Sequence, residues 1–227
     1  MRVMILAAGR GERLRPLTDT VPKAMVVAGG RPLIAWHLER LAAAGYREAV
    51  VNVSHLADAI VEGLGDGERY GVRITYSRER EPLETAGGIA KARALLGEAP
   101  FLLVNADIYC EFDFASLRRV SLGARLAHLV LVPNPPHRGR GDFTLEEGSV
   151  GDGAGPRYTY AGIAVMSPAM VAGVAAGQKA PLAPLLYAAA ARRLVGGELY
   201  RGVWQDVGTR ERLAELEAHL AAGRAER

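Results

Sequence analysis

A glycine turn flanked by basic side chains lies close to the N-terminus, in the segment LAAGRGERLRPLTDTVPKAM. Gly9 and Gly11 follow a short apolar run and permit backbone conformations that a β-carbon would block, so consecutive N–H groups can face an anion. Four basic residues lie in or soon after this turn, namely Arg10, Arg13, Arg15 and Lys23. These residue types predict a phosphate-binding turn, with an ordinary strand turn and solvated arginines as the alternative.

Two well-known phosphate motifs do not account for this turn. A dinucleotide fingerprint of the form G-x-G-x-x-G requires glycine at position 14, where the chain has Leu14. A P-loop requires Gly-Lys-Ser or Gly-Lys-Thr, but the lysines at positions 23, 91 and 179 follow proline, alanine and glutamine. The turn therefore belongs to neither motif.

The charge of the chain is concentrated around the same turn. The 227 residues carry 28 basic and 25 acidic side chains, which gives a formal net charge of +3. Residues 1–23 hold five basic and two acidic side chains, so they account for the whole excess. Nucleic-acid-binding proteins typically spread basic residues over a face. The distribution instead indicates one compact polyanion, such as a triphosphate, and argues against an RNA-binding module.

Two aspartates stand near the ends of apolar segments that have the pattern of strands. Asp107 follows Phe101–Asn105, and Asp206 lies at the end of Glu198–Val207, just before a predicted helix with Thr209 as its N-cap. Ligands of open α/β sheets bind at the carboxyl ends of strands, so we expect both carboxylates at one site. The alternative is that each aspartate caps a turn or a helix.

Strand and helix patterns alternate along the first half of the chain. Strand-like runs occupy Val3–Ala8, Ala49–Val53, Val72–Tyr76 and Phe101–Asn105, and helical patterns lie between them at residues 32–45, Leu56–Leu64 and Ala86–Leu96. Such alternation with nearly continuous apolar strands predicts an α/β fold. We expect a mostly parallel sheet with helices on both faces.

The middle of the chain has a different pattern. Leu126–Val132, Phe143–Glu146 and Tyr158–Met166 look like hairpin strands, and they predict a small antiparallel insertion. Helical patterns return at Pro168–Ala176 and Pro181–Arg193. No linker divides the chain, so we expect one domain over residues 1–227 with the insertion embedded at about 108–195.

The composition argues against membrane and disulfide-rich proteins. Hydrophobic residues make up 49% of the chain, but no run approaches the roughly 20 apolar residues of a membrane span. Val3–Ala8 is too short for a secretory signal and charged residues follow it at once. Cys110 is the single cysteine, and it shows no zinc-ligand spacing with the five histidines. We therefore expect a cytoplasmic protein without a membrane partner.

The segment from Gly9 to Lys23 resembles the sugar-1-phosphate nucleotidylyltransferases. Their signature is a first strand followed by G-x-G-x-R-L-x-P-L-T and then P-K, and this chain has GRGERLRPLT at Gly9–Thr18 and then Pro22-Lys23. Glu12 departs from the pattern because many members carry threonine there, so we assign no phosphate contact to its side chain. The molybdopterin branch is similar at the first turn but lacks the P-L-T and P-K continuation.

Three further segments carry the resemblance over nearly the whole chain. They are PLETAGGI at Pro82–Ile89, which is similar to the family's loop beside the base and ribose, FLLVNADI with Asn105 and Asp107, and VWQDVGT with Asp206. The resemblance implies a Rossmann-like nucleotide-diphospho-sugar transferase fold of the GT-A type, with a sugar-binding insertion. It also implies a Mg²⁺ cofactor at Asp107 and Asp206, since Mg²⁺ uses one or two carboxylates with phosphate oxygens and water.

The resemblance implies a reaction in which a sugar 1-phosphate oxygen attacks the α-phosphorus of a nucleoside triphosphate and pyrophosphate leaves. Catalytic roles fall on Arg13 and Lys23, toward the phosphates, and on Asp107 and Asp206 as metal ligands. Nucleotide contacts are implied for Ala8, Gly9, Arg10, Gly11, Glu12, Arg13, Lys23, Thr85 and Gly87. Sugar contacts are implied for Asn105, Gly141, Asp142, Asp152 and Gly162. Lys179 either supplies a further positive charge or solvates its helix.

Within the family, the chain looks most like the branch that condenses UTP with N-acetylmuramic acid 1-phosphate during peptidoglycan recycling. The segments PLETAGGI, LVNADI, NPPHRGRGDF and YRGVWQDVGT carry this resemblance. Mannose-1-phosphate guanylyltransferases and glucose-1-phosphate thymidylyl- or uridylyltransferases are the enzyme alternatives. A nucleotide-sugar sensor is the non-enzyme alternative, although the presence of both Asp107 and Asp206 favours an enzyme. The sequence leaves the oligomeric state open, with a monomer as the working expectation.

Overall fold

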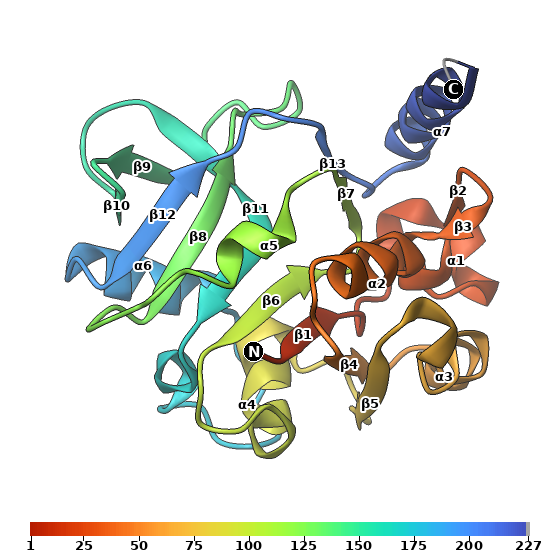
Figure 1. Ribbon diagram of the computed structural model, residues 1–227, viewed down its shortest axis with the longest axis horizontal. Helices are drawn as coiled ribbons and strands as arrows, with labels where there is room; N and C mark the ends of the chain where they lie inside the picture. The colour runs from red at the N-terminus through yellow and green to blue at the C-terminus, as the bar shows by residue number, and fades with distance from the viewer. Residues whose placement is uncertain (226–227) are drawn as a thin grey trace.

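A nine-stranded sheet forms the centre of the computed structural model, which describes residues 1–225 (Figure 1). Its first four strands are all parallel and follow the spatial order β5 (Arg73–Arg78), β4 (Glu48–Val53), β1 (Val3–Leu6) and β6 (Phe101–Asn105). The residues of β1, β4 and β6 are almost all buried, as expected for parallel strands with helices on both faces.

Five further strands extend the same sheet beyond β6. Their order is β11 (Arg157–Met166), β8 (Ala127–Val132), β12 (Val195–Leu199), β10 (Ser149–Gly151) and β9 (Phe143–Glu146). β11 runs antiparallel to β6 and β8, and β9 pairs with both β10 and β11, so these five strands close into a barrel-like ring. The predicted α/β fold is confirmed, but the sheet is mixed, because the antiparallel strands continue the parallel ones.

Helices cover both faces of the sheet, as the sequence predicted. On one face, α2 (Leu33–Ala43), α3 (Ala57–Leu64) and α5 (Phe114–Leu117) pack on the strands. On the other face lie α4 (Glu84–Leu96), α6 (Ala183–Ala191) and the short turn η4 (Pro168–Val171). No helix in the described part of the chain is both long enough and apolar enough to cross a membrane.

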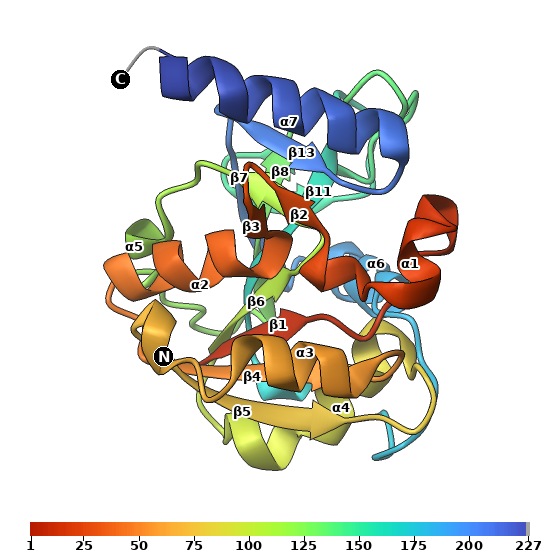
Figure 2. The same ribbon diagram turned by 90° about the vertical axis from the view of Figure 1, so that its right-hand side faces the viewer.

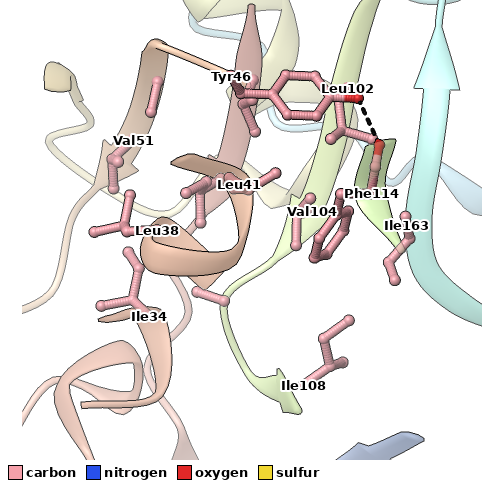
Figure 3. Close-up of a cluster of buried hydrophobic side chains, with 14 of the residues drawn as sticks. Ile34, Leu38, Leu41, Tyr46, Val51, Leu102, Val104, Ile108, Phe114 and Ile163 are labelled. Carbon is pink, nitrogen blue, oxygen red and sulfur yellow. Dashed lines mark hydrogen bonds between the residues drawn. The ribbon is translucent and has the colours of Figure 1, made fainter. Parts of the chain in front are cut away.

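The core between α2 and the sheet explains the helical pattern seen in the sequence. Ile34, Leu38 and Leu41 lie at positions i, i+4 and i+7 of α2, so they share one face and pack against β1, β4 and β6 (Figure 3). The Tyr46 hydroxyl donates a 3.1 Å hydrogen bond to the carbonyl of Phe114 at the edge of this cluster. Burying each aliphatic side chain contributes about 1.5–3 kcal/mol.

A second, two-stranded sheet carries both aspartates singled out above. It consists of β7 (Ile108–Cys110), which directly follows Asp107, and β13 (Trp204–Asp206). The strand expected at residues 198–207 is therefore two strands, because the chain leaves β12 at Leu199 and re-forms pairing only at Trp204.

The C-terminal helix α7 (Arg210–Ala225) lies across β7 and β13 (Figure 2). Thr209 precedes it and accepts the backbone N–H of Arg212 at 3.4 Å, which agrees with its predicted role as N-cap. Leu216 of α7 is fully buried in a third apolar cluster, beside the hairpin of β2 (Val27–Ala28) and β3 (Arg31–Pro32). Short helical turns complete the chain at η1 (Glu12–Leu14), α1 (Leu17–Thr20), η2 (Lys23–Met25) and η3 (Glu68–Tyr70).

Candidate active site

A cavity of about 240 Å³ opens at the carboxyl ends of β1, β4 and β6. The glycine turn after β1 forms one wall, and the loop that leads into α4 forms the opposite wall. Of the residues that the sequence singled out, Ala8, Gly9, Gly11, Lys23, Thr85, Asn105 and Asp107 line this cavity. The fold therefore brings together residues that lie up to 99 positions apart in the sequence.

The conformation of the turn requires glycine at position 11. Its φ is +68°, and a β-carbon there would lie 2.9 Å from Cγ2 of Thr18 and 3.1 Å from Cβ of Lys23. The hydroxyl of Thr18 donates to the Gly11 carbonyl at 2.8 Å, which fixes the turn from outside the cavity. Gly9 differs, because no atom of residues 1–225 lies within 4 Å of its β-carbon position, so its open side is accessible to a ligand.

A larger cavity of about 790 Å³ adjoins the first and shares Gly9, Gly11 and Lys23 with it. Its cationic lining consists of Arg10, Arg13, Lys23 and Lys179. The guanidinium of Arg13 packs beside Gly208, two residues after Asp206, where a β-carbon would lie 2.8 Å from its Nη2. Three acidic residues, Glu12, Glu81 and Glu84, line it as well, so the lining is mixed in charge with an excess of one cation. The four cationic side chains beside the glycine turn are of the types that bind phosphate oxygens.

Lys23 and Asp107 form an ion pair between Nζ and Oδ2 at the junction of the two cavities. The Lys23 side chain is 13% exposed and that of Asp107 is 36% exposed. Both groups lie where a ligand in the cavity would meet them.

Asp206 lies next to Asp107 along the β7–β13 pair, because it pairs with Ile108 and the N–H of Val207 donates to the Asp107 carbonyl at 2.7 Å. Its side chain is 16% exposed and forms an ion pair through Oδ2 with Arg212 of α7. Nε2 of His137 lies 3.0 Å from Oδ1, but it also lies 2.9 Å from Nη1 of Arg212. Oδ1 itself is buried, and apart from this contact with His137 it has no hydrogen-bond partner in residues 1–225.

A third cavity of about 430 Å³ adjoins the first through Thr85 and Asn105. One wall is polar and contains Asp142, whose Oδ2 accepts the backbone N–H of Tyr160 at 2.8 Å. Arg138 also lines the cavity, and its Nη1 lies 3.3 Å from Asp142 Oδ2. Most of the remaining lining is apolar or aromatic and consists of Phe143, Pro181, Leu182, Ala183, Leu186 and Tyr187.

Burial raises the pKa of Tyr160, whose hydroxyl oxygen is buried without a hydrogen-bond partner. The residue lines the third cavity, and its hydroxyl stays protonated and neutral near neutral pH.

The remaining candidates from the sequence have structural partners of their own. A β-carbon on Gly141 would lie 2.6 Å from the backbone of β11, and one on Gly162 would lie 2.6 Å from Nδ2 of Asn105. Asp152 forms a 2.5 Å ion pair with Arg157. Gly87 donates its N–H to the Ala180 carbonyl at 3.1 Å, and its β-carbon position is 2.3 Å from the Gln178 carbonyl. These three glycines allow close packing within the protein.

Comparison with known proteins decides the family. Residues 2–141 match the nucleotidyl transferase family model. The chain is also 48% identical over 231 residues to the N-acetylmuramate alpha-1-phosphate uridylyltransferase of Neisseria meningitidis, with 98% of this chain and 99% of that protein covered. This chain belongs to the nucleotidyl transferase family.

Other similarities of this nucleotidyl transferase cover less of the relative or show the fold alone. It is 46% identical over 120 residues to the mannose-1-phosphate guanyltransferase of Schizosaccharomyces pombe, over 52% of this chain and 33% of that protein. A Bacillus anthracis protein described as a glucose-1-phosphate thymidylyltransferase superposes with a TM-score of 0.85 at 19% identity, covering 97% of this chain and 95% of that one. HddC from Yersinia pseudotuberculosis gives 0.78 at 22% identity, with 96% and 98% covered.

Asp107 and Asp206 are the carboxylates of this transferase that could hold Mg²⁺. No group of three or more histidine, cysteine, aspartate or glutamate side chains that could hold a metal occurs in residues 1–225. Asp107 and Asp206 nevertheless fit Mg²⁺, because this ion takes one or two carboxylates and completes its shell with phosphate oxygens and water. The buried Oδ1 of Asp206, whose one close contact among the described residues is Nε2 of His137 at 3.0 Å, is an oxygen of the type that this ion prefers.

Sequence reasoning missed several residues of the site. Arg138 stands in the quoted segment NPPHRGRGDF, but one arginine among several in a loop carries no signal of its own. Arg212 and His137 lie 75 residues apart in the sequence, and in the folded chain both contact Asp206. Glu84 lines all three cavities, with a φ of +59° that non-glycine residues seldom adopt. Its Oε1 lies 3.7 Å from Nζ of Lys179, and both residues line the larger cavity.

Proposed function

We propose that this nucleotidyl transferase condenses UTP with N-acetylmuramic acid 1-phosphate to give UDP-N-acetylmuramic acid and pyrophosphate. The observation that carries the proposal is the 48% identity to the Neisseria uridylyltransferase over nearly the full length of both chains. The similarity to the mannose-1-phosphate guanyltransferase of Schizosaccharomyces pombe extends over only 120 residues. The match to the uridylyltransferase covers nearly all of both chains, whereas the match to the guanyltransferase covers about half of this chain, and this difference favours the uridylyltransferase.

The proposed reaction is an in-line displacement at phosphorus. An oxygen of the sugar 1-phosphate forms a bond to the α-phosphorus of UTP, and the bond from that phosphorus to the bridging oxygen of pyrophosphate breaks. The attacking phosphate is already anionic near neutral pH, so no general base is required. The tasks left to the protein are to position two polyanions and to offset their charge.

The cationic side chains divide this work according to their places in the site. Arg10 and Arg13 face the larger cavity beside the glycine turn, where the leaving β- and γ-phosphates would lie. Lys23 stands at the junction of the cavities, where the α-phosphate would meet the attacking phosphate. Its ammonium would exchange Asp107 for phosphate oxygens as the substrates bind. Mg²⁺ held by Asp107 and Asp206 would supply further positive charge toward the phosphates.

The third cavity has the chemistry to select an acidic N-acetylated sugar. N-Acetylmuramic acid differs from ordinary hexoses by a lactyl carboxylate and by methyl groups on its lactyl and acetamido substituents. Arg138 supplies a cation for the carboxylate, and Leu182 and Leu186 supply apolar surface for the methyl groups. Tyr160 supplies a buried hydroxyl donor. Neutral hexose 1-phosphates would leave Arg138 without this partner.

Pyrophosphate release tests the proposal directly. The protein is incubated with Mg²⁺ while UTP, dTTP, GTP and CTP are each combined with the 1-phosphates of N-acetylmuramic acid, N-acetylglucosamine, glucose and mannose. The expected result is fastest release with UTP and N-acetylmuramic acid 1-phosphate. Preference for GTP with mannose 1-phosphate would overturn the substrate assignment, and release with no pair would favour a nucleotide-sugar sensor.

A role in peptidoglycan recycling would follow from these substrates, and it would place the protein in the cytoplasm, where UTP is available. The proposal requires no second subunit, in line with the monomer expected from the sequence.

A further inference from the structure

A buried chain of hydrogen bonds links the two walls of the first cavity. The backbone N–H of Ala7 donates to Oδ1 of Asn52 at 2.9 Å, and Nδ2 of Asn52 donates to Oε1 of Glu79 at 2.7 Å. The backbone N–H of Leu83 then donates to Oε2 of Glu79 at 2.9 Å. Asn52 is 3% exposed and Glu79 is 5% exposed, so water has little access to these groups. The loss of any one of these hydrogen bonds would therefore leave a buried polar group unsatisfied, which is costly.

The order of donors and acceptors along this chain determines which side chains can complete it. Both ends are backbone N–H groups, at Ala7 and Leu83, and these can only donate. Asn52 accepts at one end and donates at the other, so Glu79 must accept twice. A carboxylate does this, whereas the amide of glutamine would face one donor with another donor. The hydrogen-bond chain therefore explains why Glu79 is a buried acid although its side-chain hydrogen bonds come from an amide and a backbone N–H and not from a cation.

The two backbone groups that end this series of hydrogen bonds, at Ala7 and Leu83, lie where the two cavity-lining loops begin. Ala7 lies two residues before Gly9, and both line the first cavity. Leu83 does not line it, but the next two residues, Glu84 and Thr85, do. Glu84 is the residue with a φ of +59°, so the loop needs an anchor beside it to keep this conformation. Asn52 itself also lines the cavity.

The following helix is shaped to accommodate the same pair of side chains. Gly88 of α4 packs against them, and a β-carbon at this position would lie 2.8 Å from both Nδ2 of Asn52 and Oε1 of Glu79. Alanine is ordinarily preferred to glycine inside a helix, so this glycine is explained by the side chains it must admit.

We propose that Asn52 and Glu79 are positioning residues for the nucleotide, because they hold the glycine turn and the loop at residues 82–85 at a fixed separation. This inference rests on the proposed function, since the nucleoside triphosphate is the ligand that both walls would contact. Neither residue carries a reacting group. Their effect reaches the nucleotide through the backbone at Ala7 and Leu83, and Asn52 also forms part of the cavity wall.

A swap of the two side chains tests the proposal. Glu79→Gln creates a conflict between two donors, and Asn52→Asp places two carboxylates face to face. In the double variant Asn52→Asp/Glu79→Gln, the new carboxylate at position 52 would accept from Ala7 and from the new amide at position 79, whose oxygen would accept from Leu83. Every bond is then restored with the same net charge. Glu198→Gln, which removes a partly exposed carboxylate of β12 that is paired with His128 of β8, is the matched control.

The readouts are the dissociation constant of UTP by titration calorimetry and the Michaelis constants of both substrates, all measured well below the unfolding temperature. Each single variant is expected to weaken UTP binding by about tenfold or more, as the loss of one buried hydrogen bond implies. The Michaelis constant of the sugar 1-phosphate should change by less than about threefold, since the third cavity shares no residue of the hydrogen-bond chain. The double variant should recover most of the affinity.

Gly88→Ala is a second perturbation in case a single variant does not fold, because it presses on the pair without changing any donor or acceptor. It should also weaken UTP binding. Folded single variants that bind UTP like the original protein, or a double variant no better than the singles, would overturn the inference. If the original protein binds no UTP, the proposed function fails instead.

Discussion

Replacing Lys23 by methionine separates catalysis from folding. The substitution keeps most of the apolar stem of the side chain and removes only the ammonium, which is paired with Asp107. Loss of one preorganised group that faces developing charge lowers kcat by about 10²–10³, equivalent to about 2.7–4 kcal/mol. We expect a loss of this size in pyrophosphate release with both substrates saturating.

The same substitution should affect stability much less. Asp107 is 36% exposed, so water can hydrate its carboxylate once the lysine has gone. Ion pairs with this degree of solvent access typically contribute about 0–1 kcal/mol. The free energy of unfolding, measured by urea denaturation, should therefore fall by no more than about 1 kcal/mol. The transition-state effect should exceed the effect on folding several times over.

Lys91→Met is the matched control for this experiment, because Lys91 lies on α4 and does not line the three cavities. It should leave kcat unchanged. The reasoning is refuted if Lys23→Met retains kcat within about threefold of the original value, since a phosphate contact would have cost far more. It is also refuted if the activity lost is matched by lost folded protein.

Three further predictions concern the sugar, the turn and the core. Arg138→Gln should raise the Michaelis constant for N-acetylmuramic acid 1-phosphate by about tenfold or more but leave that for N-acetylglucosamine 1-phosphate unchanged, as competing kinetics would show. Gly11→Ala should lower the unfolding free energy by about 1–3 kcal/mol in urea titrations, because φ is +68° and Thr18 crowds the new β-carbon. Burial lowers the pKa of His37 from 6.5 to about 4. Between pH 6.5 and about pH 4 the unfolded chain therefore binds one proton more than the folded chain at His37. The free energy of unfolding should fall by about 1–2 kcal/mol from pH 7 to pH 5, and by less in His37→Gln, as urea titrations at the two pH values would show.

The parallel half of the fold could be predicted because its signals are local. Val3–Leu6 and Phe101–Asn105 are continuous apolar runs that lie side by side in the sheet, and the helix α2 that covers them repeats its apolar residues at helical spacing. In the closed ring, β8, β9 and β11 were also predicted as strands from their apolar runs, but their closure with β12 and β10 had no local signal. β9 pairs with two strands at once, and β12 has the sequence VGGEL, which lacks the apolar pattern of a strand.

The residues of the candidate site also divide into those with a local sequence signal and those without one. Asp107 could be proposed from sequence because it directly follows a buried strand, and Lys23 because it lies in a segment rich in glycine and basic residues. Their ion pair, and the contact of Arg212 with Asp206, depend on side chains that only the folded chain brings together. A charged residue without a local motif cannot be assigned a partner from sequence, since its neighbours are set by tertiary packing.

The glycines near the site serve different purposes. The sequence predicted ligand contacts for Gly9 and Gly162, where the missing β-carbon allows a close backbone approach, and it assigned no contact to Gly88. Gly9 does face open space, but Gly162 makes room for the amide of Asn105, and Gly88 makes room for Asn52 and Glu79. In these two places the absent β-carbon is replaced by a polar side chain of the protein. A glycine in such a motif can therefore act on the ligand indirectly, by allowing a neighbouring side chain to occupy the one position from which it can shape the cavity.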